Sequence, residues 1–154
     1  LPISYRDPAV RRLIYAVKFG GAIDGLTFFA TVYGSRLLRH LPDADWCVCP
    51  IPLSRERVRE RGFNQALVLS EQLGWPFEIR ELLVRQRHTR PQAELDGQDR
   101  ARNVRGAFRV TDRVPPLVLL VDDVITTGAT LRAAAGCLRR AGAKTIWAVT
   151  IAHG

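Results

Sequence analysis

Two adjacent carboxylates, Asp122 and Asp123, follow an apolar run and precede three threonines and a glycine within the next seven residues. Carboxylates accept hydrogen bonds from a ribose diol, while threonine hydroxyls and the backbone N–H groups of a helix start bind anions. Gly128 lets the backbone approach a phosphate closely because it has no Cβ. The segment 121–130 therefore predicts a site for a ribose with a 5′-phosphate.

Three other interpretations of the acid pair are weaker. A nucleoside triphosphatase also ends a buried strand in acids, but the chain has no G-x-x-x-x-G-K-[ST] loop to hold a triphosphate. A phosphorylation receiver domain needs a lysine after its last strand, whereas Lys144 comes before the last apolar run. Helix capping explains one acid well, but it does not explain two acids followed by so many hydroxyl and glycine positions.

The chain must place this segment at the end of a buried strand and the start of a helix. Residues 117–121 are a continuous branched apolar run, which is typical of a central parallel strand covered on both faces. Residues 129–140 repeat apolar positions at helical spacing and end before Gly142. A second apolar run, 47–51, turns at Pro52-Leu53-Ser54-Arg55, which predicts another strand with a functional loop at its end. A plain turn shaped by Pro50 and Pro52 is the alternative, and we favour the functional loop.

The remaining pattern completes an α/β fold. We expect helices at 8–19, 26–40 and 62–73, strands at 77–84, 107–110 and 145–151, and a long polar loop at 85–105. Alternating strands and helices predict a mainly parallel central sheet with helices on both faces. In such sheets ligands bind at the carboxyl ends of the strands.

Composition limits the class of protein. A chain of 154 residues, 47% hydrophobic, is of the size of one domain, and no apolar stretch is long enough to span a membrane. With no signal peptide pattern either, we expect a cytoplasmic protein without membrane insertion. Cys47, Cys49 and Cys137 fit neither a disulfide framework nor a good zinc pattern, so we expect reduced core residues.

The charge is strongly positive and comes mostly from arginine. The formal net charge is +8, and Lys18 and Lys144 are the only lysines. A GC-rich genome explains many arginines, but not their clustering at 55–61 and 85–113. Clustered guanidinium groups suit a polyanion, either a small phosphorylated substrate or a nucleic acid.

The acid-threonine segment resembles the phosphoribosyl pyrophosphate (PRPP) motif of type I phosphoribosyltransferases. Further blocks, at 13–20, 50–54, 61–65, 92–103 and 106–108, make nearly the whole chain similar to the ComF family of competence-associated phosphoribosyltransferases. The Arg-Gly-Phe-Asn-Gln block at 61–65 is the most specific for this family. Relatives usually carry a four-cysteine zinc segment ahead of the matched region, so we expect 1–154 to be a single phosphoribosyltransferase domain truncated at its N-terminus, without zinc.

The resemblance implies a role for each part of the site. Asp122 and Asp123 would hold the ribose hydroxyls and a Mg²⁺ cofactor through water. The 5′-phosphate would contact Thr126, Thr127, Gly128, Ala129 and Thr130. Pyrophosphate would contact Leu53, Ser54, Arg55 and Lys18, in a loop where type I enzymes often have a cis peptide. The loop at 85–105 would close over the site with Arg87, Arg90 and Gln92, although a solvated loop and an exposed Lys18 are equally open.

The implied reaction transfers the phosphoribosyl group of PRPP to an acceptor that the residues do not identify. Positioning and charge neutralisation suffice for it, and His40, His88 and His153 have no triad or metal spacing. Two alternatives stay open. One is a regulatory module that binds PRPP without turnover. The other is a nucleic-acid-associated competence protein whose partners include single-stranded DNA or the competence machinery.

Overall fold

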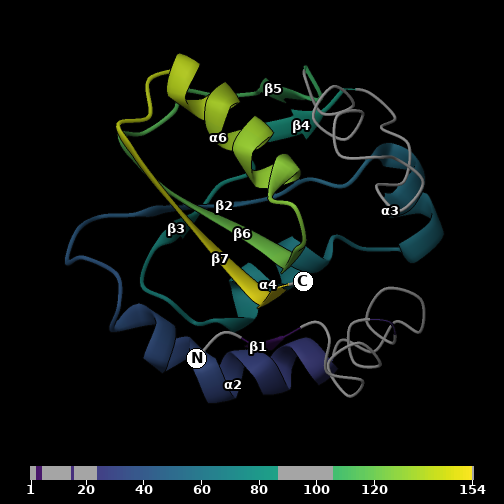
Figure 1. The fold of residues 1–154 in the computed structure, drawn as a ribbon, viewed down its shortest axis with the longest axis vertical. Helices are drawn as coiled ribbons and strands as arrows, with labels where there is room; N and C mark the ends of the chain where they lie inside the picture. The colour runs from purple at the N-terminus through teal and green to yellow at the C-terminus, as the bar shows by residue number, and fades with distance from the viewer. Residues whose placement is uncertain (1–2, 5–14, 16–23, 87–105, 154) are drawn as a thin grey trace.

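A five-stranded, all-parallel sheet forms the centre of the molecule in the computed structural model, which describes residues 3–4, 15, 24–86 and 106–153 (Figure 1). The strand order is β1-β7-β6-β2-β3. The strands are β1 (Ile3–Ser4), β2 (Cys47–Pro50), β3 (Glu78–Ile79), β6 (Leu117–Ile125) and β7 (Thr145–His153). The predicted fold class, a mainly parallel sheet with helices on both faces, is confirmed.

The longest buried strand is β6, which pairs with β2 on one side and β7 on the other. Val118 to Val121 are at most 1% exposed, because both faces of β6 are covered. This burial explains the uninterrupted apolar run in the sequence. Pairing on both sides up to Val121 also fixes the start of the backbone of Asp122 and Asp123, which follow directly in β6.

Helices cover the two faces of the sheet with two separate apolar clusters (Figure 1). On one face, α6 (Ala129–Arg140) packs with the hairpin of β4 (Leu83–Arg85) and β5 (Phe108–Val110). On the other face lie α2 (Asp24–Leu38) and α4 (Gln65–Gln72). The loop after β2 and the loop after β6, both at the carboxyl edge of the sheet, therefore start from strands that are packed on both faces.

The cysteines are unpaired, as expected. Cys47 and Cys49 are buried in β2, and Cys137 is half-buried in α6. Burial raises the pKa of the Cys49 thiol to about 12. Cys49 is thus a neutral core residue at physiological pH.

The predicted helix at 62–73 is wrong in its first turn, and an additional helix precedes it. Residues Arg55–Arg61 form α3, which ends at Gly62 in the left-handed conformation with φ 80°. Asn64 then caps α4, whose Ala66 N–H donates to Asn64 Oδ1 at 3.1 Å. The run 55–61 is polar and has no apolar stripe, so helical periodicity did not reveal α3. Ser54, a residue type that often caps helices, is the local signal that could have revealed its start.

The predicted strand at 77–84 is also wrong, because it is two strands in two different sheets. β3 pairs in parallel with β2, whereas β4 pairs antiparallel with β5 in a two-stranded sheet. The chain bends between them, where Leu82 N–H donates to Arg80 O at 2.9 Å. Residues 77–84 form a continuous run of mixed polar and apolar residues, which gave no sign of this bend.

The predicted helix at 8–19 and residues 87–105 of the predicted loop lie outside the described residues, apart from Tyr15 in a helical position. Residues 85 and 86, at the start of that loop, belong to the end of β4 and the position after it. Within the described ranges, no helix is long and apolar enough to cross a membrane.

Candidate ribose-phosphate site

The site lies where β2 and β6 part at the carboxyl edge of the sheet. Their last paired residues are Pro50 and Val121, and Ile51 N–H still donates to Val121 O at 2.9 Å. β2 then turns away through Pro52, whereas β6 continues beside β7 as far as Ile125. The acid pair therefore begins at the point where β6 loses its neighbour on one side.

The two carboxylates are held by the backbone around them. Asp122 Oδ1 accepts from Asp123 N–H at 2.9 Å, and Asp123 Oδ1 accepts from Val124 N–H at 2.8 Å. Both residues are half-buried. These short-range bonds restrain the side chains after the strand has lost its β2 neighbour, so the orientation of both carboxylates is set locally.

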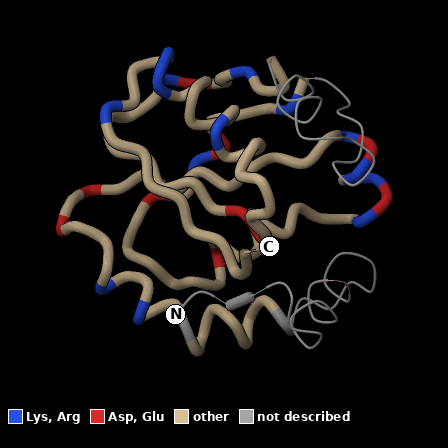
Figure 2. Tube along the Cα trace, viewed as in Figure 1, with Lys and Arg blue, Asp and Glu red and all other residues tan. Residues whose placement is uncertain are grey.

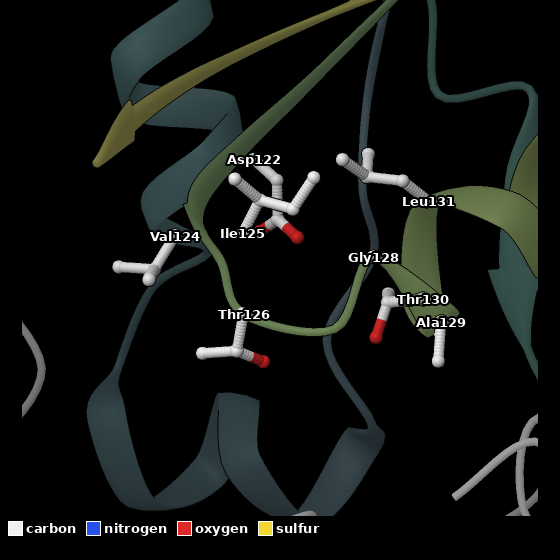
Figure 3. Close-up of a pocket in the computed structure, with 8 residues that line it drawn as sticks. All are labelled: Asp122, Val124, Ile125, Thr126, Gly128, Ala129, Thr130 and Leu131. Atoms are coloured by element: carbon white, nitrogen blue, oxygen red, sulfur yellow. The ribbon is translucent and has the colours of Figure 1, made fainter. Parts of the chain in front are cut away.

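A small, shallow cavity of about 20 Å³ lies against the loop that joins β6 to α6 (Figure 3). In Figure 3 the hydroxyls of Thr126 and Thr130 project from the two ends of the loop toward the space beneath it, while Val124 points away. The cavity is lined by Asp122, Val124, Ile125, Thr126, Gly128, Ala129, Thr130 and Leu131. Of the residues predicted for the ribose and 5′-phosphate, Asp123 and Thr127 alone are not in this lining.

The loop ends in an open helix N-terminus. Gly128 caps α6 with φ 70°, a conformation that favours glycine, and no side chain caps the helix there. Thr127 instead accepts a long bond of 3.4 Å from Ala129 N–H. Gly128, Ala129, Thr130 and Leu131 line the cavity, so the cavity lies at the positive end of the helix dipole of α6.

Arg132 is a neighbour of this turn that sequence reasoning missed. A Cβ built on Gly128 would lie 2.9 Å from Arg132 Nη1, so the guanidinium folds back over the glycine. Side chains on a helix lean toward its N-terminus, which brings a residue one turn into α6 back to the start. A cation beside a helix N-terminus is unfavourable unless an anion joins it.

The loop after β2 is built differently. Ser54 is buried and caps α3, accepting from Arg57 N–H at 3.4 Å. Leu53, Ser54 and Arg55 line a wide groove between α3 and the β4–β5 hairpin, not the cavity at the acid loop. All peptide bonds among the described residues are trans, so the cis peptide implied by the resemblance is not found.

Arg61 and Arg85, which belong to the two arginine clusters seen in the sequence, each feel the charge of one acid, a pairing that the sequence did not predict. Burial and the nearby Arg57 lower the pKa of the Arg61 guanidinium, and Asp123 opposes both effects. Burial and Arg57 likewise lower the pKa of Arg85, and Asp122 opposes them. Arg85 also stacks over the Phe108 ring, with its Cζ 5.5 Å from the centroid. Each acid therefore has an arginine within electrostatic reach.

Charges of both signs alternate along α3, which projects beyond the end of β2 (Figure 2). The exposed Arg55 and Arg59 line the wide groove from α3, and Arg85 and Arg109 line it from the hairpin. Arginines from both clusters of the sequence thus line one groove, together with Glu56 and Glu81, and give it a net positive charge.

Four predicted contact residues lie outside the described residues and have no structural account here: Lys18, Arg87, Arg90 and Gln92.

The residues present fit a magnesium ion bound with a ligand. No group of three or more His, Cys, Asp and Glu side chains comes together in the described part of the chain. Mg²⁺ needs no such cage, because it is commonly held by one or two carboxylates, waters and the phosphates of a substrate. Asp122 and Asp123 would supply those carboxylates.

Comparison with known proteins identifies the family. The family model described as "Phosphoribosyl transferase domain" matches residues 116–154, which contain β6, the acid loop, α6 and β7. The chain is 41% identical to Competence protein F of Haemophilus influenzae, over 69% of this chain and 48% of that protein. It is 31% identical to Competence protein ComFC of Bacillus subtilis, over 90% of this chain and 57% of that protein. It is 37% identical to DNA utilization protein YhgH of Salmonella typhimurium, over 94% and 67% respectively.

The chain belongs to the ComF family. Its fold is that of the type I phosphoribosyltransferases, and the matched residues carry the acids and the open helix N-terminus described above. The chain spans about half the length of the first two ComF relatives. The block at 61–65 spans the end of α3 and the start of α4, and Asn64 within it donates to Ile51 O just after β2.

Proposed function

We propose that this ComF domain binds PRPP with Mg²⁺ and transfers the phosphoribosyl group to an acceptor, releasing pyrophosphate. The observation that carries the proposal is the acid loop itself. The restrained carboxylate of Asp122, the hydroxyls of Thr126 and Thr130 and the first residues of α6 line one cavity, and Asp123 follows Asp122 directly in the chain. A ribose 5-phosphate has a diol and a phosphate at matching positions, so its chemistry fits both halves of the loop.

The residues of the acid loop divide into two groups in the proposed complex. Asp122 and Asp123 accept hydrogen bonds from the ribose hydroxyls and hold Mg²⁺ through water. Thr126, Thr127 and Thr130, with the backbone N–H groups from Gly128 onward, bind the 5′-phosphate. Mg²⁺ supplies positive charge against the pyrophosphate group when it is bound.

In the proposed reaction, the bond between ribose C1 and the pyrophosphate oxygen breaks, and an electron pair of the acceptor forms the new bond to C1. The leaving pyrophosphate takes the electrons of the broken bond. Arg85, which feels the charge of Asp122, and Arg55 and Arg59 of α3 are the described cations that we assign to neutralising this charge, without a protein nucleophile.

A two-stage experiment tests the proposal. Millimolar PRPP with Mg²⁺ should raise the melting temperature, because a ligand of the native state stabilises it by mass action. A screen of bases and amines with labelled PRPP should then reveal pyrophosphate release with one acceptor class. An unchanged melting curve for a folded protein would refute the site. Stabilisation without release for any acceptor would favour the regulatory module that binds PRPP without turnover.

A role in handling DNA is a second proposal, supported by the basic groove and by the names of two relatives, a competence protein and a DNA utilization protein. Single-stranded DNA and proteins of the competence machinery are the partners that it implies. Titration with a labelled oligonucleotide at two salt concentrations tests it. Binding that Arg55→Gln and Arg109→Gln weaken would support the groove as the contact surface. Undiminished binding by both variants would refute it.

A further inference from the structure

The last strand of the central sheet has a largely open edge. β7 pairs with β6 along one side, whereas its other side meets only the short β1. Figure 1 shows β1 beside the carboxyl end of β7, where it pairs with Ala152 and His153. Within the described residues, no strand pairs with the outer side of residues 145–151. Backbone N–H and C=O groups along this side are therefore available to another strand.

This open stretch lacks the features that usually protect an edge strand. Residues 145–151 read Thr-Ile-Trp-Ala-Val-Thr-Ile, with no charge, proline or glycine, although 25% of the whole chain is charged. Monomeric proteins commonly keep an edge strand short, or place lysine or proline on it, so that it does not pair with another chain. Five of the seven residues are β-branched, which favours an extended strand. Trp147 is 41% exposed, and Ala148 beside it is exposed too.

The open stretch is also complementary to itself when two copies run antiparallel. Its midpoint is Ala148, so a two-fold axis at this residue places the two alanines opposite each other, where their small side chains let the backbones approach. The other opposed pairs are Trp147 with Val149, Ile146 with Thr150 and Thr145 with Ile151. An aromatic residue opposite a β-branched one is a favourable cross-strand pair. The second copy would end beside Ile151, just short of the residues that β1 already covers.

We propose that a second copy of this chain binds the open edge of β7, so that the two sheets join into one through antiparallel β7 strands. The occupant is a second copy because the stretch offers no charge to an acidic or basic partner and because its two halves match each other. So short a contact is a small interface, so the dimer should be weak and should form reversibly. None of residues 145–151 lines the acid-loop cavity or the wide groove, so this inference is independent of the proposed function.

Sedimentation velocity over a concentration series tests whether the chain dimerises through this edge. Between about 5 and about 500 µM, the weight-average mass of the parent should rise toward twice that of the monomer. Ala148→Lys should stay monomeric, because two like charges would face each other at the axis. Phe28→Lys is the matched control and should dimerise as the parent does, because Phe28 is an apolar side chain of α2 that is 67% exposed.

Disulfide cross-linking tests the register of the two strands, and it does not depend on how well a lysine is tolerated. In Ala148→Cys the introduced cysteines lie directly opposite each other, with Cα atoms about 4.5–5.5 Å apart, a distance that a disulfide can span. In Thr145→Cys, at another exposed position of the edge, they lie about 20 Å apart. Under diamide, Ala148→Cys should give a cross-linked dimer. Thr145→Cys should not, nor should the parent, whose cysteines are buried or half-buried.

Each contrary result overturns the proposal. A parent that stays monomeric at the highest concentration shows that a second copy does not occupy the edge, which would then suit a strand of another polypeptide. Dimerisation of folded Ala148→Lys, or its loss in folded Phe28→Lys, places the contact elsewhere on the molecule. A dimer in which Ala148→Cys does not cross-link, or cross-links no faster than Thr145→Cys, is not paired about Ala148.

Discussion

Asn64 joins the start of α4 to the end of β2, because its Nδ2 donates to the carbonyl of Ile51, 13 residues earlier in the chain. The same side chain accepts from Ala66 N–H through Oδ1. The side-chain amide of Asn64 therefore both caps α4 and holds the turn after β2 through a hydrogen bond. An aspartate could cap but could not donate.

Replacing Asn64 should separate these two roles. We expect Asn64→Ala to lower the free energy of unfolding by about 1–2 kcal/mol, because it loses the cap and the tie. Asn64→Asp keeps the cap and should lose less. Urea denaturation of the two variants measures the difference. Equal losses would mean that the cap on α4 contributes nothing, whereas parent-like stability of Asn64→Asp would mean that the bond to Ile51 contributes nothing.

The acid pair should control metal-dependent binding. Asp122→Asn combined with Asp123→Asn keeps the size of both side chains but removes two charges. We expect Mg²⁺-dependent affinity for PRPP to fall by more than about tenfold, or about 1.4 kcal/mol, with the fold retained. Calorimetric titration measures the affinity and circular dichroism the fold. If the double variant bound PRPP with Mg²⁺ as tightly as the parent does, Asp122 and Asp123 would have only a structural role.

Gly128 should control phosphate binding whether or not metal is present. Gly128→Val puts a branched side chain at φ 70° and within 2.9 Å of Arg132 Nη1. Binding of ribose 5-phosphate should fall both with and without Mg²⁺, unlike in the double amide variant. Gly142→Val places the same residue in a strained turn with open space around it, far along α6, and controls for strain alone. A loss confined to the metal complex would contradict the assignment.

Arg132 should contribute to the affinity for a 5′-phosphate. Arg132→Gln removes the cation that lies over the helix start, so binding of ribose 5-phosphate should weaken by about threefold to tenfold and depend less on salt. Ribose without phosphate should be unaffected. The comparison is made by titration at low and high salt, with Arg139→Gln, in the last turn of the same helix, as the control. Equal behaviour of the two variants would exclude Arg132 from the site.

The buried Cys49 thiol makes stability depend on alkaline pH. Its pKa is raised to about 12 in the folded state from an ordinary 9.0. The stabilisation is fully present below pH 9.0 and is lost as the pH rises toward 12, because the unfolded thiol ionises first. Cys49→Ala should therefore flatten the fall in melting temperature between pH 9 and pH 10.5. The same slope in both proteins would show that other groups cause it.

The sequence by itself determined the acid loop and the elements that flank it. Asp122, Asp123 and Gly128 are neighbours in the chain, and a buried strand followed by a helix leaves their backbone few alternatives, so local pattern sufficed. The parallel sheet followed from the order of strands and helices in the same way. Even the missed α3 had a local sign, the capping Ser54.

Only the tertiary structure decided what surrounds the acids. Asp123 and Asp122 influence the pKa values of Arg61 in α3 and Arg85 in the hairpin, elements far away in the chain. The β4–β5 hairpin was also not predicted, because the run 77–84 looks continuous in the sequence but contributes to two different sheets. Charges act through space and not along the chain, so no local pattern could show which of 21 arginines lie beside the carboxylates.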